Sequence, residues 1–532
     1  MKKLNYMKYA FGLVIALSAV TSCSDDFYTN EIKGAESPET FFQTDEGAYQ
    51  GVLAGYLQLA STYAEQWETP WTYRIMMGDE VSAGGVSRGS KLSYEVLNEY
   101  DFDANNAHSS LVFKNLYQGI GRSNVLLDNM PVDSPERIKI AAEAKFLRAF
   151  NYFDLVTIFG EAIPLVTKEL SPDEYQQFPA EAGAVWAQIE KDLTEAIADL
   201  PLKSAYSQED KIRANKGAAQ ALLGKTYLYQ GKYALAVEQF EAVISSGEFD
   251  LAPDYSRIWR KDQEFGTESL FELSYTENKG TGLGNYRWGG GNAKFNTDNV
   301  LMLQFGPFTT NFDNMESIGQ ISDGFGCGYP LPGLYDAYVA EGDQVRREGT
   351  MITEAEFLAA GVTFDEGVQS ADIYGYYGFL RTKLALYTDE SGGPIATLNN
   401  GTNWRVLRFG DVLLMAAEAQ VLSGGDLGKA RNYINRVRTR VQLGNTPAAD
   451  GDLMDAIINE RRLELSYEGY RFPDLVRWNN NGVISDADLS STLDAVISEL
   501  PLRKPFNPIF KLAPIPQTEI NTNPNMVQNP GY

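Results

Sequence analysis

The chain has 532 residues, of which 44% are hydrophobic and 12% aromatic, and its 71 acidic and 45 basic side chains give a formal net charge of −26. A chain of this length and apolar content is expected to fold around a large core, which excludes an intrinsically disordered protein. The acidic excess disfavours binding to nucleic acids and anionic lipid surfaces, because both depend on clustered lysine and arginine, and it is compatible with neutral ligands.

Residues 1–22 have the pattern of a lipoprotein signal peptide. Basic residues up to Lys8 precede an apolar run over residues 9–20 that is too short to span a bilayer. Residues 19–23, AVTSC, resemble a lipobox, in which the cysteine is acylated and becomes the new N-terminus. We therefore expect a lipid anchor on Cys23, a membrane location without a transmembrane helix, and a polar tether over residues 23–44.

Helical periodicity begins after the tether. Apolar positions recur at helical spacing in residues 46–63, 111–130, 135–159 and 184–200. Between the first two, residues 64–107 lack a clear period and are expected to form a loop.

Two segments resemble the paired helices of tetratricopeptide repeats. In residues 217–247 the small side chains of Ala218, Ala221 and Gly224 allow close helix packing, and Gly231 separates two helices. Residues 404–422 and 427–441 have the same pattern; unrelated helical hairpins are the alternative. The sequence predicts one mostly α domain over residues 45–532, with a tetratricopeptide-like scaffold at about 45–248 and 404–480 and a C-terminal tail over 481–532.

Residues 249–403 differ from this scaffold. Runs such as TGLGNYRWGGGN (281–292) and DGFGCGYPLPG (323–333) contain too much glycine and proline for helix. We expect a loop-rich lobe inserted into the scaffold. Loops held by a rigid frame often carry function, so a ligand site is expected here and in residues 64–107.

An acidic stripe marks residues 453–478, which we expect to form one helix. Glu460, Glu464 and Glu468 are spaced i, i+4, i+8 within its apolar arc. Buried carboxylates need partners, so we expect a buried network of glutamate and arginine. The candidate arginines are Arg405, Arg408, Arg461, Arg471 and Arg477. Acid–base chemistry is the alternative, but arginine pairing lowers a carboxyl pKa and makes a poor proton donor.

Few residues are available for catalysis or metal binding. The single histidine, His108, lies in the polar run NNAHSS and is expected at the solvated surface. Once Cys23 is acylated, Cys327 has no partner for a disulfide or a thiolate metal site. Asp101, Asp103 and Asn105 begin like a calcium loop, but the required later glycine and glutamate are absent. We expect no cofactor, no metal and no catalytic residue.

Four strings carry a resemblance to a known family. They are EAKFLRAFNYFDLVTIFGEAIPLV from Glu143, WRVLRFGDVLLMAAEAQ from Trp404, NERRLELSYEGYRFPDLVRW from Asn459 and KLAPIPQTEINTNPNMVQNPGY from Lys511. In this order they resemble the RagB/SusD family of nutrient-binding outer-membrane lipoproteins from Bacteroidetes. The resemblance implies a SusD-like fold without catalytic activity, and delivery of oligosaccharides or, in some branches, peptides to a SusC-like TonB-dependent transporter. Ser24, Asp25 and Asp26 resemble the signal for export to the outer face of the membrane.

Sugar rings stack on aromatic faces and hydrogen-bond to polar side chains. The loop residues that we expect to bind glycan are Trp67, Trp71, Tyr73, Asp79, Asn285, Tyr286, Arg287 and Trp288. The alternative for each aromatic side chain is packing beneath its own loop. We expect a cell-surface glycan-binding lipoprotein; the alternatives are a RagB-like peptide-binding protein, a surface glycoside hydrolase, for which no motif is present, and a scaffold without ligand.

Overall fold

The computed structural model describes residues 37–65, 67–276, 299–308, 310–319, 324–388, 390 and 400–532. This part of the chain is mostly α-helical, as predicted, and its strands form small two-stranded sheets. No helix in these ranges is long and apolar enough to cross a membrane.

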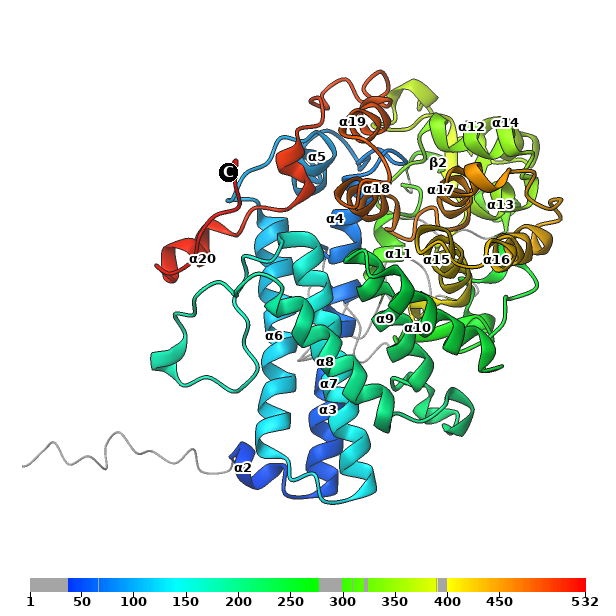
Figure 1. Ribbon diagram of the computed structural model, residues 1–532. Helices are drawn as coiled ribbons and strands as arrows, with labels where there is room; N and C mark the ends of the chain where they lie inside the picture. The colour runs from blue at the N-terminus through cyan, green and yellow to red at the C-terminus, as the bar shows by residue number, and fades with distance from the viewer. Residues whose placement is uncertain are drawn as a thin grey trace, which may run out of the picture.

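Three long helices form a column at the N-terminal side of the molecule (Figure 1): α3 (Asp45–Ala60), α6 (Ala107–Asn129) and α7 (Pro135–Phe159). Their starts are set by side-chain caps, because Thr44, Asn106 and Ser134 each accept a hydrogen bond from the backbone N–H three residues later. The predicted helices at 46–63, 111–130 and 135–159 are confirmed to within a few residues at each end.

Paired helices continue from this column. Helix α8 (Ala184–Asp199) packs on α7, and α9 (Lys216–Tyr229), α10 (Tyr233–Ser245), α15 (Phe409–Leu422) and α16 (Leu427–Arg440) follow, each packed on the one before. Gly224 of α9 lies against the Phe240 ring of α10, where an added Cβ would come within 2.6 Å of a ring carbon. The tetratricopeptide-like prediction is confirmed, including the reason for the small residue.

Two details of the secondary-structure prediction are wrong. Residues 404–408 are the strand β6 (Trp404–Arg408), which pairs antiparallel with β1 (Ser269–Leu273), and not the start of a helix. Residues 64–107 contain two short helices, α4 (Pro70–Met76) and α5 (Leu92–Asn98). Helices of seven residues are too short to show a period; α4 starts at a capping box formed by Thr69 and Thr72.

The region predicted to be rich in loops also contains short elements. Its helices are α11 (Val300–Gln304), α12 (Pro332–Glu341), α13 (Gln344–Thr350) and α14 (Glu354–Ala359). Two small sheets join β2 (Phe312–Asp313) to β4 (Thr363–Phe364) and β3 (Met351–Thr353) to β5 (Phe379–Arg381). A separate apolar cluster around Phe312, Phe357 and Leu380 packs beneath them. The remaining helices are α2 (Pro38–Phe41), α17 (Leu453–Glu464), α18 (Arg471–Asn480), α19 (Asp486–Asp494) and α20 (Gln517–Thr522).

Residues 453–478 form two helices, α17 and α18, where one was predicted. The chain breaks between them because Tyr467 and Gly469 have φ angles of 65° and 80°, in the left-handed region. Glu468 therefore follows α17 and does not extend it. Glu460, Glu464 and Glu468 are nevertheless all buried.

Each glutamate of the stripe is paired. Glu464 contacts Arg408 at 2.6 Å, Arg440 at 2.5 Å and Arg346 at 3.3 Å. Arg408 also contacts Glu268 and Glu468, each at 2.7 Å. The other pairs are Glu468 with Lys383 and Glu460 with Arg346 and Arg438. We call these residues the Glu464 network.

The network was predicted correctly, but most of its partners were not. Of the five candidate arginines only Arg408 binds a glutamate of the stripe. The other four pair elsewhere: Arg405 with Glu272, Arg461 with Asp411 and Asp474, Arg471 with Asp79, and Arg477 with Glu418 and Asp474. Burial alone would raise the pKa of Glu464, but Arg440, Arg408 and Arg346 together hold it well below its usual range. Glu464 is therefore a structural anion and a poor proton donor.

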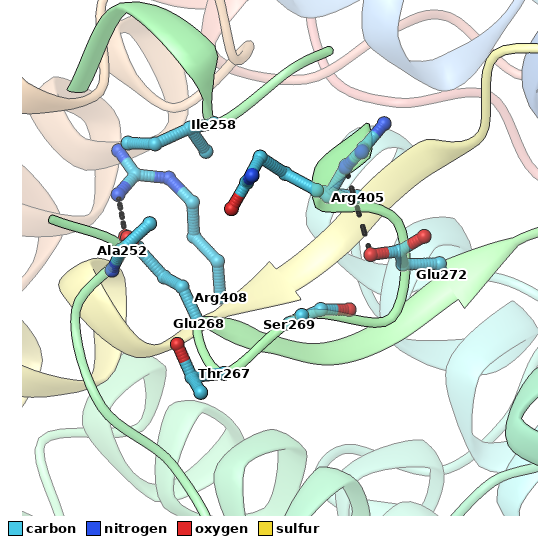
Figure 2. A pocket seen from close by; sticks show the side chains of 10 residues that line it. Ala252, Ile258, Thr267, Glu268, Ser269, Glu272, Arg405 and Arg408 are labelled. Atoms are coloured by element: carbon cyan, nitrogen blue, oxygen red, sulfur yellow. Dashed lines mark hydrogen bonds and ion pairs between the residues drawn. The ribbon is translucent and has the colours of Figure 1, made fainter. Parts of the chain in front are cut away.

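A small cavity borders this network (Figure 2). Its volume is about 10 Å³, and Figure 2 shows the Arg408–Glu268 and Arg405–Glu272 pairs at its wall. A cavity must offer about 10–15 Å³ to hold one water molecule, so this space cannot admit a sugar.

A second buried acidic pair, Asp79 and Glu80, lies beside arginines of α17 and α18. Arg471 contacts Asp79 at 3.0 Å, and Arg462 lies 3.7 Å from Asp79 and 3.8 Å from Glu80. Burial alone would raise the pKa of Asp79, but Arg471 and Arg462 lower it to about 2. Burial, followed by the charge of Asp79, raises the pKa of Glu80 to about 7.

Replacing Arg408 with methionine should strongly destabilise the protein, because Glu464, Glu468 and Glu268 would each lose a buried partner. The loss expected for breaking a buried ion pair is about 3–5 kcal/mol, measured by urea unfolding. Arg257→Met is the matched control, since Arg257 and its partner Asp262 are both exposed and should change stability by less than about 1 kcal/mol. Equal stability of the two variants would contradict a structural role for the network.

Glu80→Gln should change the pH dependence of stability. In the unfolded chain Glu80 ionises near its ordinary pKa of 4.5, whereas in the folded protein it keeps its proton up to about pH 7. The wild-type protein therefore loses stability as pH rises from about 4.5 to 7, and the variant should lack this component. Thermal unfolding of both proteins at pH 5 and pH 8 measures the difference; a stability gap that stays constant between the two pH values would refute the raised pKa.

Candidate functional site

The eight residues predicted to bind ligand fall into three groups in the structure. Asn285, Tyr286, Arg287 and Trp288 lie outside the described residues. Trp71, Tyr73 and Asp79 are buried, each 2–3% exposed, and Trp67 is half-buried.

Trp71 belongs to the core, contrary to the expectation that it faces a ligand. Its Nε1 donates a hydrogen bond to the Tyr467 carbonyl at 2.8 Å, and its ring lies edge-on to Phe305 and Trp404. Tyr73 is buried to the same extent, and the Asp79 carboxylate forms an ion pair with Arg471. The unpredicted helix α4 packs on α18 and buries the side chains of Trp71 and Tyr73.

Trp67 remains accessible at the start of this segment. The Lys91 ammonium lies 3.6 Å from the centroid of one Trp67 ring, and the Phe325 ring lies edge-on at 5.6 Å. Glu68 and Ser93 flank them, joined by a 3.0 Å hydrogen bond. All five residues are half-buried. We call Trp67, Glu68, Lys91, Ser93 and Phe325 the Trp67 surface.

Several contacts hold the Trp67 surface in place. The Tyr94 hydroxyl donates to the Trp67 carbonyl, and the Thr69 capping box fixes the chain just after it. Residues 81–85 are joined to residues 326–330 by backbone hydrogen bonds, including Gly85 N–H to Gly326 O at 2.7 Å. Gly84, with φ of 61°, is required in this contact, because a Cβ would lie 2.3 Å from the Gly326 oxygen. The surface is thus an aromatic and polar patch that hydrogen bonds connect to neighbouring segments.

The electrostatics of this surface suit a neutral ligand. Burial lowers the pKa of Lys91, and its ammonium gains a favourable contact with the negative face of the indole. Val86, in the loop before α5, and Leu92, the first residue of α5, are 51% and 58% exposed. Apolar faces beside a carboxylate, an ammonium and a hydroxyl can stack a sugar ring and hydrogen-bond its hydroxyl groups.

Lys91 and Phe325 were not identified from the sequence. Their proximity to Trp67 depends on the pairing of residues 81–85 with 326–330, which no local pattern encodes. Phe325 lies in the glycine-rich run 323–333, and that run was the one available signal.

His108 is a correction to the sequence analysis. It is fully buried instead of solvated, and its Nε2 lies 2.8 Å from the Thr72 hydroxyl. Burial lowers the pKa of His108 to about 3, so the ring is neutral. Its Nδ1 has no hydrogen-bond partner among the described residues. A catalytic triad needs a carboxylate at that nitrogen, so His108 supports the fold.

Cys327 is buried, and burial raises the pKa of its thiol to about 12. Within the described ranges no group of three or more His, Cys, Asp or Glu side chains is arranged to hold a metal ion.

Comparison with known proteins places this fold in a family. Residues 335–532 match the family described as SusD, and residues 43–228 match the family described as starch-binding and associating with the outer membrane. A SusD-like protein of Formosa agariphila is 25% identical over 99% of this chain and 100% of its own. The structure of a laminarin-binding SusD-like protein is 30% identical with a TM-score of 0.78, covering 92% of this chain and 100% of its own.

A further solved structure, surface glycan-binding protein A from Bacteroides uniformis, is 26% identical with a TM-score of 0.75 and covers 91% of this chain and 99% of its own. Both solved structures are named for binding and not for catalysis. From the matches at both ends of the chain and the agreement over nearly its whole length, we conclude that this protein belongs to the SusD family.

Proposed function

We propose that this protein captures oligosaccharides or polysaccharides at the cell surface, using the Trp67 surface together with Asn285, Tyr286, Arg287 and Trp288. The observation that carries the proposal is a partly exposed tryptophan, flanked by a carboxylate, an ammonium and a hydroxyl, on a loop fixed by Gly84 and the Thr69 cap. Such a surface needs no rearrangement before it binds a sugar, which reduces the entropic cost of binding.

The ligand class follows from charge and from the relatives. A protein with 71 acidic and 45 basic residues repels anionic polymers, which favours neutral glycans. A laminarin-binding protein at 30% identity supports a glucan as the first ligand to test. Peptide capture remains the alternative.

We also propose how the protein is anchored and where it delivers its ligand. Residues 1–22 are removed as a signal peptide, Cys23 carries the lipid, and residues 23–44 tether one SusD-like domain to the exterior of the outer membrane. The protein then passes its ligand to a SusC-like TonB-dependent transporter and does not cleave it. His108 is buried against Thr72, and Glu464 is buried in an ion pair with Arg408. Neither can exchange protons with a ligand, which supports a non-catalytic role.

Trp67→Ala should weaken glycan binding about tenfold, because one lost aromatic platform is worth about 1–2 kcal/mol. The measurement is calorimetric titration of the protein lacking residues 1–23 with laminarin, with the products checked for released sugars. Phe178→Ala is the control, since Phe178 is 71% exposed and belongs neither to the Trp67 surface nor to the 285–288 group. Affinity unchanged in Trp67→Ala would remove Trp67 from the site, and released oligosaccharides would overturn the non-catalytic role.

A further inference from the structure

A large groove has none of the residues of the Trp67 surface in its lining. Its volume is about 1180 Å³, and it is bounded by α6, the segment joining α7 to α8, and the C-terminal helix α20. Figure 1 shows this connecting segment projecting beside α6, below α20. The groove is lined by, among others, Phe113, Tyr117, Tyr175, Gln176, Glu519 and Met526. We call it the α20 groove.

The walls of the α20 groove are fixed by hydrogen bonds between distant segments. Pro164 and Pro179 form a β-bridge that closes the connecting segment at its base. Asn523 donates its amide hydrogen to the Gln177 carbonyl at 2.7 Å, and Asn525 donates to the Gln176 carbonyl at 2.8 Å. The groove is therefore a formed feature of the fold.

Aromatic side chains form one part of its lining. Tyr175 is 62% exposed, so its ring is largely available for contact. Tyr117 is half-buried, and its hydroxyl donates to the Pro164 carbonyl at 2.7 Å, which fixes its ring against Phe113 at a centroid distance of 4.8 Å. These rings have the amphipathic character that sugar rings contact by stacking.

Polar groups in the groove are free to bind. Glu519 is half-buried, and no residue in the described part of the chain donates a hydrogen bond to its carboxylate. Lys114 and the Gln176 side chain are exposed, while the Gln176 backbone carbonyl accepts the hydrogen bond from Asn525. An acceptor, a charged donor and an amide thus surround the aromatic rings.

We propose that the α20 groove is a second binding site for a neutral oligosaccharide, sharing no residue with the Trp67 surface. Pockets for small molecules measure about 300–1,000 Å³, so this groove has room for several linked sugar residues. The groove places the charged groups of Glu519 and Lys114 among aromatic rings. This favours a hydroxyl-rich ligand over a protein surface, because the centre of a protein interface is depleted of charged residues. A second site would raise the avidity for a polysaccharide chain.

The test is an NMR titration of protein with 13C-labelled methionine methyl groups, since Met526 lines the groove. Met526→Leu identifies its signal, and laminarihexaose is the probe. We expect the Met526 signal to shift saturably in the wild type and in Trp67→Ala. Tyr175→Ala should weaken this titration on the order of tenfold, whereas Tyr175→Phe and the neighbouring exposed control Phe178→Ala should leave it unchanged.

The outcomes separate this proposal from the first one. If calorimetry records binding of laminarihexaose but the Met526 signal stays in place, the groove is not a glycan site and another occupant, such as a protein surface, must be sought. A Met526 shift that disappears in Trp67→Ala would also overturn an independent second site. If neither measurement detects the sugar, both proposals fail for glucans.

Discussion

The Glu464 network is the interaction on which the rest of the structure depends. Glu464 ends α17, and its three arginine partners come from α13, the end of β6 and the end of α16. Each buried charge costs several kcal/mol if it is left without a partner, so these segments must reach their places together. The inserted region and the helical scaffold are joined in this way, because Arg346 belongs to the first and Arg440 to the second.

This frame also positions the Trp67 surface. The break between α17 and α18 directs the Tyr467 carbonyl to the Trp71 indole, and Arg471 of α18 pairs with Asp79. The first contact fixes α4 to the frame, and the second fixes Asp79, three residues after the end of α4. Trp67 precedes α4 by three residues and lies at the edge of this frame. Its partly exposed ring can contact a ligand without any unfolding of α4.

Much of the fold was predictable because its signals are local. Long helices such as α7 reveal themselves by apolar period and by caps, and the glutamate stripe signals buried ion pairs by its spacing. Partner choice was not predictable: Arg346 and Arg440 lie 118 and 24 residues from Glu464 in the chain, and nothing local distinguishes them from Arg461. The burial of Trp71 and His108 depends on the tertiary packing of α4, which local sequence does not show. For the site, only Trp67 among the four described candidates stays accessible.

We propose that a rigid, ion-paired frame presents a preformed glycan-binding surface around Trp67. Hydrogen–deuterium exchange of the wild-type protein with and without laminarin tests it most directly. We expect slower exchange in residues 67–69 and 86–94 on binding, with α15 and α17 equally protected in both states. Protection spreading through α15 and α17 on binding would show that the frame is formed by the ligand, and no change in residues 67–94 would show that the glycan binds elsewhere.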